Sequence, residues 1–452
     1  MRRNASISHC SPSRDLRLAK SLFPVKTFAL LRLPGESAAA IINKSFMEKN
    51  KVIIRYAQTP EEVEEQVRAG AHAFSSHYQG LLDAFKRHQS YPRHKREFSR
   101  IAVVDGRIAS GLIIVDKTLI IGKARLRTAG IGDVFTHPDY RKKGYATAVL
   151  RDAVRFMKEE GFVLSCLFGI QDFYDRAAGF ASALCNGTLT VATADAARCK
   201  GRASVVRLSA RLLETIMSLR DEENRRLGFG FDRPREWWDY LVNRRGWKKA
   251  TVFATGNKPF AYACLGEEDS LRVYEYACQP EGYEAFLGGL ARHAQRKRLK
   301  EVRITTPPDH PFCDFALQYG GNLQLSYCRN GGGMMRIVNL DAMAVGMRAE
   351  WEERLRHSPL RGWTGELAFL TDLGKFGLTV RGGVITVRPG ETVRGAATVR
   401  VPQRRLIQLL VGYRSVATVA HDPDVRIPAA ALSVVEALFP HRHPMTLGSD
   451  GF

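Results

Sequence analysis

The sequence has no apolar run that approaches the ~20 residues a membrane-spanning helix needs. It also has no Cys-x-x-Cys pair, because its eight cysteines are scattered and several of them sit in apolar runs. This pattern argues against a disulfide framework and against a zinc site, and no other metal-ligand spacing is seen. We therefore expect a protein without a membrane span or a metal, in a reducing cytoplasm.

Acidic residues are scarce relative to basic ones. The chain has 46 Asp and Glu against 68 Lys and Arg, which gives a formal net charge of +22. Such an excess concerns partners and says nothing of the fold. It favours anionic partners such as cofactor phosphates, nucleic acid or acidic lipid, or it reflects a generally basic, soluble surface, because the basic residues are spread along the whole chain.

A chain of 452 residues is too long for one ordinary core, so two to four domains are expected. Residues 1–50 are rich in Arg and Ser and are interpreted as a disordered leader, or as the product of a start placed upstream of Met47. Regular patterning begins with an apolar strand at 51–57. Thr59, Pro60 and two glutamates then mark the start of a helix.

Strand and helix patterns alternate over residues 51–199 in the order βαβββαβαβ, which predicts an α/β domain built around a mixed sheet. Residues 200–331 hold helices followed by a strand–strand–helix–strand series that repeats part of the first unit. Residues 332–452 predict an α+β module with a curved sheet. The expected fold class is thus α/β (α+β), in three units after the leader.

The stretch HPDYRKKGYAT, residues 137–147, lies between a predicted strand and a predicted helix. A helix N-terminus exposes unpaired N–H groups and a partial positive charge, which suit a phosphate. Gly144 allows a tight turn and a close approach by a ligand, and the small Ala146 leaves room for a pyrophosphate. The alternative interpretation is a basic turn that only caps an amphipathic helix.

The context of this motif carries a resemblance. The Arg-x-x-Gly-x-Ala of residues 141–146 follows a strand and opens a helix, and Gly161, a further strand and FYDRAAGF come after it. The chain thereby resembles the GNAT superfamily of N-acetyltransferases. The unit at 200–331 lacks the motif, LIQLLVGYRS lies in the third unit, and the chain ends ALFPHRHP…DGF. In these features it resembles the Eis-like (enhanced intracellular survival) acetyltransferases.

The resemblance implies a GNAT acetyl-CoA-binding domain at 51–199, a degenerate GNAT-like domain at 200–331, and a sterol-carrier-protein-like domain at 332–452. Acetyl-CoA would be the acyl donor, and no metal would take part. By resemblance the assembly is a homo-oligomer, a hexamer. The implied cofactor-binding residues are Val134, Phe135, Thr136, Arg141, Lys142, Lys143, Gly144, Tyr145, Ala146, Thr147, Gly169 and Ile170.

The resemblance also implies two catalytic groups. Tyr174 would protonate the departing thiolate of coenzyme A, and the terminal carboxylate of Phe452 would take a proton from the attacking amine. The interval from Tyr174 to Gly179 is one residue longer than is usual in such families. That residue is either absorbed in a loop or turns the helix face by about 100°. Asp133 is the reserve base.

The function expected from these features is direct transfer of acetyl to an amine acceptor of aminoglycoside, polyamine or lysine type. Asp133, Asp450 and the terminal carboxylate would form an acidic pocket for a cationic acceptor. The rival hypothesis is a non-enzymatic lipid- or nucleic-acid-binding protein that uses the C-terminal domain and the basic surface. Nucleic acid is the less favoured partner, because Trp237, Trp238 and Tyr240 fit the packing of an amphipathic helix better than base stacking.

Overall fold

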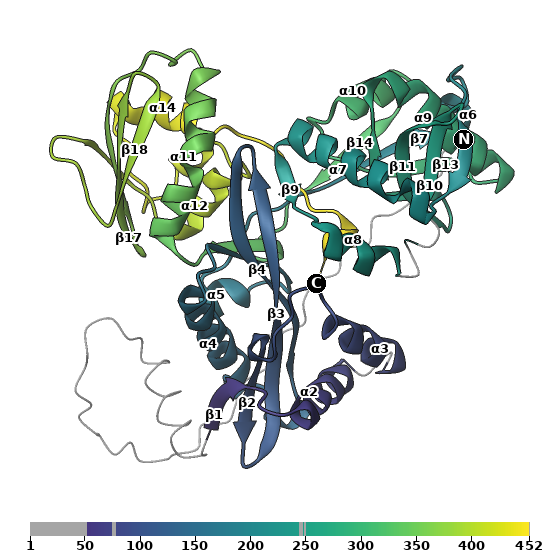
Figure 1. The fold of residues 1–452 in the computed structure, drawn as a ribbon. Coiled ribbons are helices and arrows are strands. Elements are labelled where there is room, and N and C mark those ends of the chain that lie inside the picture. The colour runs from purple at the N-terminus through teal and green to yellow at the C-terminus, as the bar shows by residue number, and fades with distance from the viewer. Residues whose placement is uncertain (1–51, 75–77, 244–246, 248–249, 452) are drawn as a thin grey trace, which may run out of the picture. The chain divides into compact units, whose positions relative to one another are not determined.

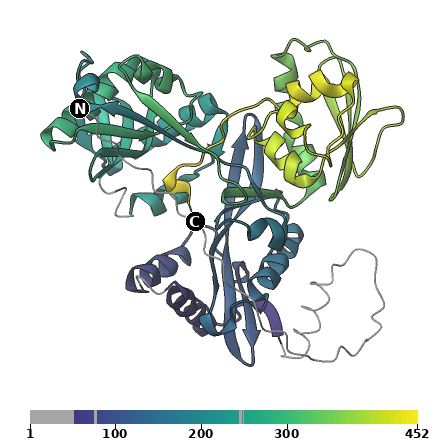
Figure 2. The same cartoon turned by 180° about the vertical axis from the view of Figure 1, so that it is seen from behind.

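The computed structural model describes residues 52–74, 78–243, 247 and 250–451, which belong to one compact unit, residues 50–452. The expected leader at 1–50 lies outside the described residues. The described part of the chain contains three β-sheets with helices packed against them (Figure 1; Figure 2 shows the reverse side). The expected mixture of α and β structure is confirmed.

The first sheet holds the strands of the N-terminal α/β region in the order β1-β2-β3-β4-β5-β15-β6, and β9 pairs with the far end of β3. Only β4 and β5 run parallel; the other pairs are antiparallel, so the sheet is mixed as expected. Its strands are β1 (Val52–Tyr56), β2 (Ser99–Val104), β3 (Arg107–Ile121), β4 (Ala124–Thr136), β5 (Leu164–Gly169), β6 (Ala181–Ser182), β9 (Phe229–Phe231) and β15 (Gly332–Ile337).

Helices cover both faces of this sheet. The helix α4 (Tyr145–Glu159) buries a stripe of apolar residues against β2 and β3, as its spacing predicts. The opposite face is covered by α2 (Pro60–Ala73), which begins as predicted: the Thr59 hydroxyl accepts a hydrogen bond from the backbone N–H of Glu62 at 3.3 Å. A second helix, α3 (Tyr78–His88), packs on α2 and was missed by the sequence interpretation.

The second sheet follows the order β14-β7-β13-β12-β11-β10-β8. Its strands are β7 (Asn186–Ala192), β8 (Ser204–Arg207), β10 (Thr251–Thr255), β11 (Lys258–Glu267), β12 (Leu271–Cys278), β13 (Glu301–Thr305) and β14 (Asn322–Ser326). Its helices are α6 (Thr193–Ala196), α7 (Leu213–Leu227), α8 (Arg235–Val242), α9 (Tyr283–Arg296) and α10 (Pro311–Leu317). Trp237 and Trp238 of α8 are buried, as the packing interpretation required.

The third sheet, in the order β18-β17-β16-β19, forms the α+β region near the C-terminus. It consists of β16 (Gly365–Thr371), β17 (Gly374–Arg381), β18 (Val384–Pro389) and β19 (Ala397–Arg400), with helices α11 (Leu340–Arg356), α12 (Gln403–Leu410), α13 (Val416–Val419) and α14 (Ala429–Leu438). One apolar cluster runs from these helices onto β4 and β5 of the first sheet.

Strand pairing crosses the expected domain boundaries. β7 precedes residue 199 but pairs with β13 and β14 in the second sheet. β15 follows residue 331 but pairs with β5 and β6 in the first sheet. The three regions therefore exchange strands, and the units at 51–199, 200–331 and 332–452 describe the order along the chain rather than separate sheets.

Within the described ranges, no helix is both long and apolar enough to cross a membrane. The same residues contain no group of three or more His, Cys, Asp or Glu side chains placed to hold a metal ion. The described cysteines are all free, and most of them are buried. They therefore contribute to packing.

Candidate functional site

A cavity of about 740 Å³ lies at the N-terminus of α4. It is bounded by the end of β4, the loop before α4, the end of α2, and the segment that follows β5. The residues that line it are Ala73, Phe74, Val134, Phe135, Thr136, Tyr140, Arg141, Lys142, Gly144, Tyr145, Ala146, Thr147, Ile170, Phe173, Tyr174 and Arg176. All the predicted cofactor residues except Lys143 and Gly169 are among them.

The helix start at this cavity has the geometry that the motif predicted. Gly144 is the N-cap residue with φ 86° and ψ 1°, a left-handed conformation that favours glycine, and no side chain caps the helix. The N–H groups of Tyr145, Ala146 and Thr147 belong to the first helical turn, which has no carbonyl partners inside the helix. An uncapped N-terminus that opens into a cavity is suited to bind a phosphate group.

The three basic side chains before Gly144 differ in their roles. The Arg141 guanidinium donates a hydrogen bond to the Ala73 carbonyl at 2.7 Å, which ties the loop to the end of α2. The Lys143 ammonium donates to the Asp139 carbonyl at 3.0 Å and lies over the Tyr140 ring. Arg141 and Lys142 line the cavity, whereas Lys143 does not. The loop conformation, more than the number of charges, therefore shapes the site.

The strand β4 is interrupted beside the cavity. Its pairing with β3 skips from Gly132 to Phe135, and its pairing with β5 ends at Ile131. Asp133, with φ 51°, and Val134 form this bulge and are in register with neither neighbouring strand. Beyond Ile131, β4 is no longer paired with β5, and backbone groups outside the ladder are available to an extended ligand.

Tyr174 lies on the far side of the cavity, at the first position of the short helix α5 (Tyr174–Ala178). Gly179, with φ 68°, ends this helix, so all the residues between Tyr174 and Gly179 are helical and the extra one is not absorbed in a loop. Gly169 packs directly under the Tyr174 ring, where a Cβ would collide with it, and Ile170 is exposed at the rim. Burial raises the pKa of Tyr174 to about 12, so its hydroxyl stays protonated at neutral pH.

Asp133 is not a lone carboxylate. Its two oxygens lie 2.8 and 2.9 Å from Nδ1 of His88, the last residue of α3. The His88 ring stacks on Tyr91 with a centroid separation of 5.1 Å. Burial raises the pKa of the Asp133 carboxyl, and the contact with His88 opposes that rise. Asp133 directly precedes the cavity residue Val134 in the chain, although neither Asp133 nor His88 is among the residues that line the cavity.

The C-terminal tail reaches the same place. Phe452, the predicted base, lies outside the described residues. The Tyr91 hydroxyl donates a hydrogen bond to the carbonyl of Gly451 at 3.4 Å. Asp450 is only 3% exposed and is ion-paired with Arg233, which is incompatible with the expected acidic pocket, because a buried and paired carboxylate cannot face a cationic acceptor. Of the three groups expected in that acidic pocket, Asp133 is next in the chain to the cavity residue Val134.

Several residues of the site were missed from the sequence. His88 was missed with its helix, although the amphipathic pattern of YQGLLDAFKRH was a usable signal. Ala73 and Phe74 end α2 and reach the cavity only because that helix crosses the sheet. Phe173 and Arg176 flank Tyr174 in sequence and line the cavity with it.

Comparison with known proteins identifies this region. Residues 54–183 match the family described as "Acetyltransferase (GNAT) domain". No curated protein sequence matches the chain significantly. The first domain is thus a GNAT acetyltransferase domain, and the chain is an enzyme of the acetyltransferase type.

Solved structures with the same fold cover nearly the whole described chain. A GCN5-related N-acetyltransferase from Anabaena variabilis has a TM-score of 0.71 at 18% identity, over 89% of this chain and 100% of that one. A probable N-acyltransferase from Enterococcus faecalis has 0.72 at 18%, over 89% and 99%. Eis1 from Mycobacterium abscessus has 0.62 at 14%, over 89% and 100%. At these identities the likeness concerns the fold alone.

Proposed function

We propose that this enzyme transfers the acetyl group of acetyl-CoA directly to an amine of aminoglycoside, polyamine or lysine type. The observation that carries the proposal is the cavity at the uncapped start of α4, bounded by the Gly144 turn on one side and by Tyr174 on the other. Its helix N-terminus suits the pyrophosphate, and its interrupted β4 suits the extended pantetheine arm.

In this proposal the amine nitrogen attacks the thioester carbonyl, and a C–N bond forms. The oxyanion accepts a hydrogen bond from a backbone N–H at the Asp133–Val134 bulge, as in other oxyanion holes. The C–S bond then breaks, and the thiolate takes a proton from Tyr174, whose raised pKa keeps it protonated until then. The ammonium proton passes to the terminal carboxylate of Phe452.

Two contacts near the C-terminal tail concern which group accepts the proton of the attacking amine. Gly451, which precedes Phe452, contacts Tyr91, and Tyr91 stacks on His88. The terminal carboxylate and the His88–Asp133 pair are therefore both candidates to accept the proton. Deletion of Phe452 alone should abolish acetylation and leave coenzyme A binding intact. Because the truncated chain still ends in a carboxylate, that of Gly451, an unchanged acetylation rate would refute the role of Phe452, and loss of that rate on a further His88→Ala change would assign the role to His88.

From the resemblance we further propose an Eis-like architecture with a sterol-carrier-like third region, a hexameric assembly and a cytoplasmic location. The rival interpretation, a non-enzymatic lipid- or nucleic-acid-binding protein, is not favoured, because the chain carries a GNAT domain with an open cavity. Light scattering coupled to size-exclusion chromatography measures the assembly directly.

The activity is tested by thiol release from acetyl-CoA with a panel of aminoglycosides, polyamines and lysine peptides, with mass spectrometry of each acceptor. We expect acetyl-CoA to bind and at least one amine to gain an acetyl group. Failure to bind coenzyme A in calorimetry would refute the proposal. Binding without transfer to any amine would refute the acceptor class.

A further inference from the structure

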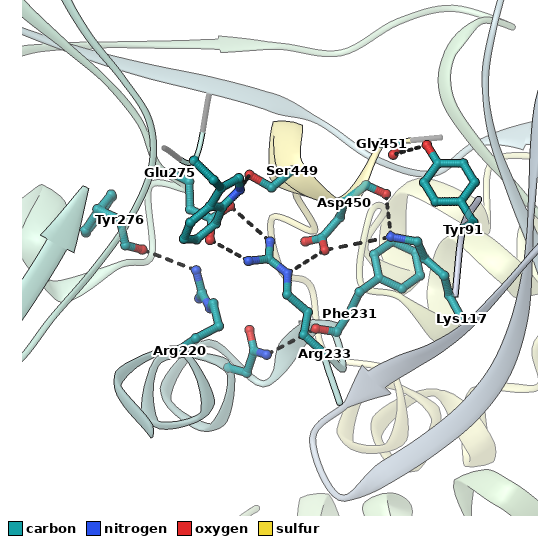
Figure 3. Close-up of polar contacts among 12 residues, drawn as sticks. Tyr91, Lys117, Arg220, Phe231, Arg233, Glu275, Tyr276, Ser449, Asp450 and Gly451 are labelled. Carbon is teal, nitrogen blue, oxygen red and sulfur yellow. Dashed lines mark hydrogen bonds and ion pairs between the residues drawn. The ribbon is translucent and has the colours of Figure 1, made fainter. Parts of the chain in front are cut away.

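The C-terminal tail ends in a buried cluster of charged side chains that the proposed chemistry does not use (Figure 3). Arg233, which follows β9, donates through Nε to Oδ1 of Asp450 at 2.8 Å. Its other two nitrogens donate to the carboxylate of Glu275 on β12 at 2.6 and 3.0 Å. All three side chains are at most 5% exposed. One guanidinium therefore joins the tail to the second sheet.

The first sheet holds the same residue from the other side. Lys117 of β3 donates through Nζ to the carbonyl of Asp450 at 2.9 Å, and its ammonium lies 3.9 Å from Oδ1. The ammonium also lies over the rings of Phe231 and Trp237, at 5.1 and 4.3 Å from their centroids. Asp450 is thus bound by two cations, Lys117 on β3 and Arg233 just after β9, as Figure 3 shows.

The residues on either side of Asp450 are also fixed. The Trp247 indole donates to the Ser449 hydroxyl at 3.2 Å, and Tyr91 donates to the Gly451 carbonyl. Glu275 is fixed in turn by the Tyr262 hydroxyl at 2.7 Å. Three consecutive tail residues are therefore held by side chains from residues 51–199 and from residues 200–331, which is far more than is needed to keep a chain end from fraying.

Stability alone does not account for this cluster. A buried ion pair contributes little more to stability than well-packed apolar side chains of similar volume would, because each charge must be desolvated. What it provides is a unique position, since hydrogen bonds to a charged group are directional and costly to break. Burial would raise the pKa of Glu275, but the Arg233 charge lowers it overall, so the Glu275 carboxylate stays ionised at neutral pH.

We propose that Arg233, Glu275 and Lys117 are positioning residues for acetyl transfer: they clamp Asp450 so that the C-terminal tail is fixed against the acceptor side of the active site. This inference rests on the proposed function. A chain of contacts links the clamp to the cavity: Gly451 contacts Tyr91, Tyr91 stacks on His88, and His88 pairs with Asp133 beside the cavity residue Val134.

The clamp also gives residues 200–331 a part in positioning the tail. Two of the three clamp residues, Arg233 and Glu275, come from the region that lacks the phosphate motif. The acetyltransferase domain supplies only Lys117. A tail whose position depends on both regions leaves the active site incomplete unless they are correctly packed together.

The test uses the full-length enzyme with Asp450→Asn and Asp450→Ala. Both changes leave the Arg233–Glu275 pair in place. A change of Arg233 would instead leave the buried Glu275 carboxylate unpaired and would destabilise the fold. The matched control is Asp422→Asn, a buried aspartate that pairs with Arg404 and Arg405 in the third region. It removes a carboxylate of similar burial at a site without contact to the tail.

We expect kcat to fall roughly 10- to 100-fold in Asp450→Ala and less in Asp450→Asn, because misplaced catalytic groups cost about that much. The Kd for acetyl-CoA should stay within about twofold of the wild-type value, since the cofactor cavity is untouched. Carboxypeptidase digestion followed by mass spectrometry should trim the variant tails faster than the wild-type tail. The Asp422 control should match the wild type in kcat and in trimming.

An Asp450→Ala enzyme with wild-type kcat and wild-type resistance to carboxypeptidase would overturn the clamp. Faster trimming with unchanged kcat would overturn its role in positioning. If Asp450→Ala does not fold, the same two measurements on Asp450→Asn decide the question. A wild-type enzyme that acetylates no amine would refute the proposed function instead, and the trimming rates would still report whether Asp450 holds the tail.

Discussion

The chain contains two strand–strand–helix–strand units of the same topology, and in the first of them a cavity lies at the start of the helix. β3, β4, α4 and β5 form the first, and β11, β12, α9 and β13 form the second. In each, the first strand pair is antiparallel and the last pair is parallel. In each, the parallel pairing stops partway, at Ile131 in β4 and at Val273 in β12.

The second opening is filled with aromatic side chains. Beyond Val273, the Tyr276 ring packs 5.6 Å from Phe286 and 5.3 Å from Phe312, and its hydroxyl is hydrogen-bonded to Thr306 at 2.8 Å. The Phe260 ring covers the start of α9, where a Cβ on Gly282 would collide with it. Topology therefore creates an opening in both units, and in the second unit aromatic side chains occupy it.

The largest expected effect comes from Tyr174→Phe, which removes the hydroxyl proposed to protonate the coenzyme A thiolate at the cavity of the first unit. We expect kcat to fall about 10²-fold or more, with little change in the Kd for acetyl-CoA. Because the pKa of Tyr174 is raised to about 12, its deprotonation should not limit the wild-type rate below about pH 10, which a pH profile of kcat will show. Tyr276→Phe is the control, because Tyr276 lies in the second unit, and this variant should keep wild-type kcat.

The next effect concerns the turn before α4. Gly144→Val places a branched side chain at φ 86° and at the cavity wall, so we expect acetyl-CoA to bind about 10- to 100-fold more weakly in calorimetry. Gly106→Val is the matched control, because Gly106 has φ 79° in the β2–β3 turn and a Cβ at that position would meet no atom within 4 Å. Equal affinity in the two variants would contradict a phosphate site at α4.

A smaller effect is expected from Asp133→Asn, which leaves the shape of the bulge but removes the charge beside His88. We expect kcat/KM to fall by about tenfold, because His88 loses its fixed orientation. The raised pKa of the Asp133 carboxyl means that the folded chain binds this proton more tightly than the unfolded chain. The group therefore stabilises the fold at low pH, and this contribution is lost as pH rises through the raised pKa.

The Asp133→Asn variant has no carboxyl group at this position, so it cannot bind or release that proton. Its melting temperature relative to the wild type should therefore rise as pH increases from about 4 to 7, the range just above the ordinary carboxyl pKa. Differential scanning calorimetry at several pH values measures this. A difference in melting temperature that stays constant across the range would contradict the raised pKa.

The smallest effect on transfer is expected from Phe260→Ala, which uncovers the start of α9. Loss of this buried ring should cost about 3–5 kcal/mol of unfolding free energy in denaturant titrations. The stoichiometry of coenzyme A should nevertheless remain one per chain, and kcat should stay within about twofold of the wild type, because Gly282 lacks the left-handed turn of Gly144. A second bound coenzyme A would show that the Phe260 ring alone keeps coenzyme A from the start of α9 in the second unit.

The first unit, which contains the cavity at the start of α4, could be predicted from the sequence. The Arg-x-x-Gly-x-Ala motif after a strand located the uncapped helix start, because a left-handed glycine and a small residue at fixed offsets are local requirements. Most elements of the three regions were predicted for the same reason, since strand and helix periodicity is written in neighbouring residues. The helix α3 was missed, and His88 with it.

Other features depend on residues far apart in the chain. The sequence could not show that β7 joins the second sheet or that β15 joins the first, because edge pairing is decided by which surfaces remain to be covered once the cores have packed. It also led to the wrong expectation for Asp450, which looked like an exposed acid near the chain end. Its two cations, Lys117 and Arg233, lie hundreds of residues earlier.

The amino-acid sequence by itself determined the donor side of this protein: a glycine turn, a helix N-terminus and a GNAT domain, all set by short-range geometry. The tertiary structure decided the proposed acceptor side, where α3, β4, the second sheet and the C-terminal tail meet. The physical reason is the range of the interactions. Backbone turns and caps are satisfied within a few residues, whereas a buried charge such as Asp450 must find its partners wherever the packed chain brings them.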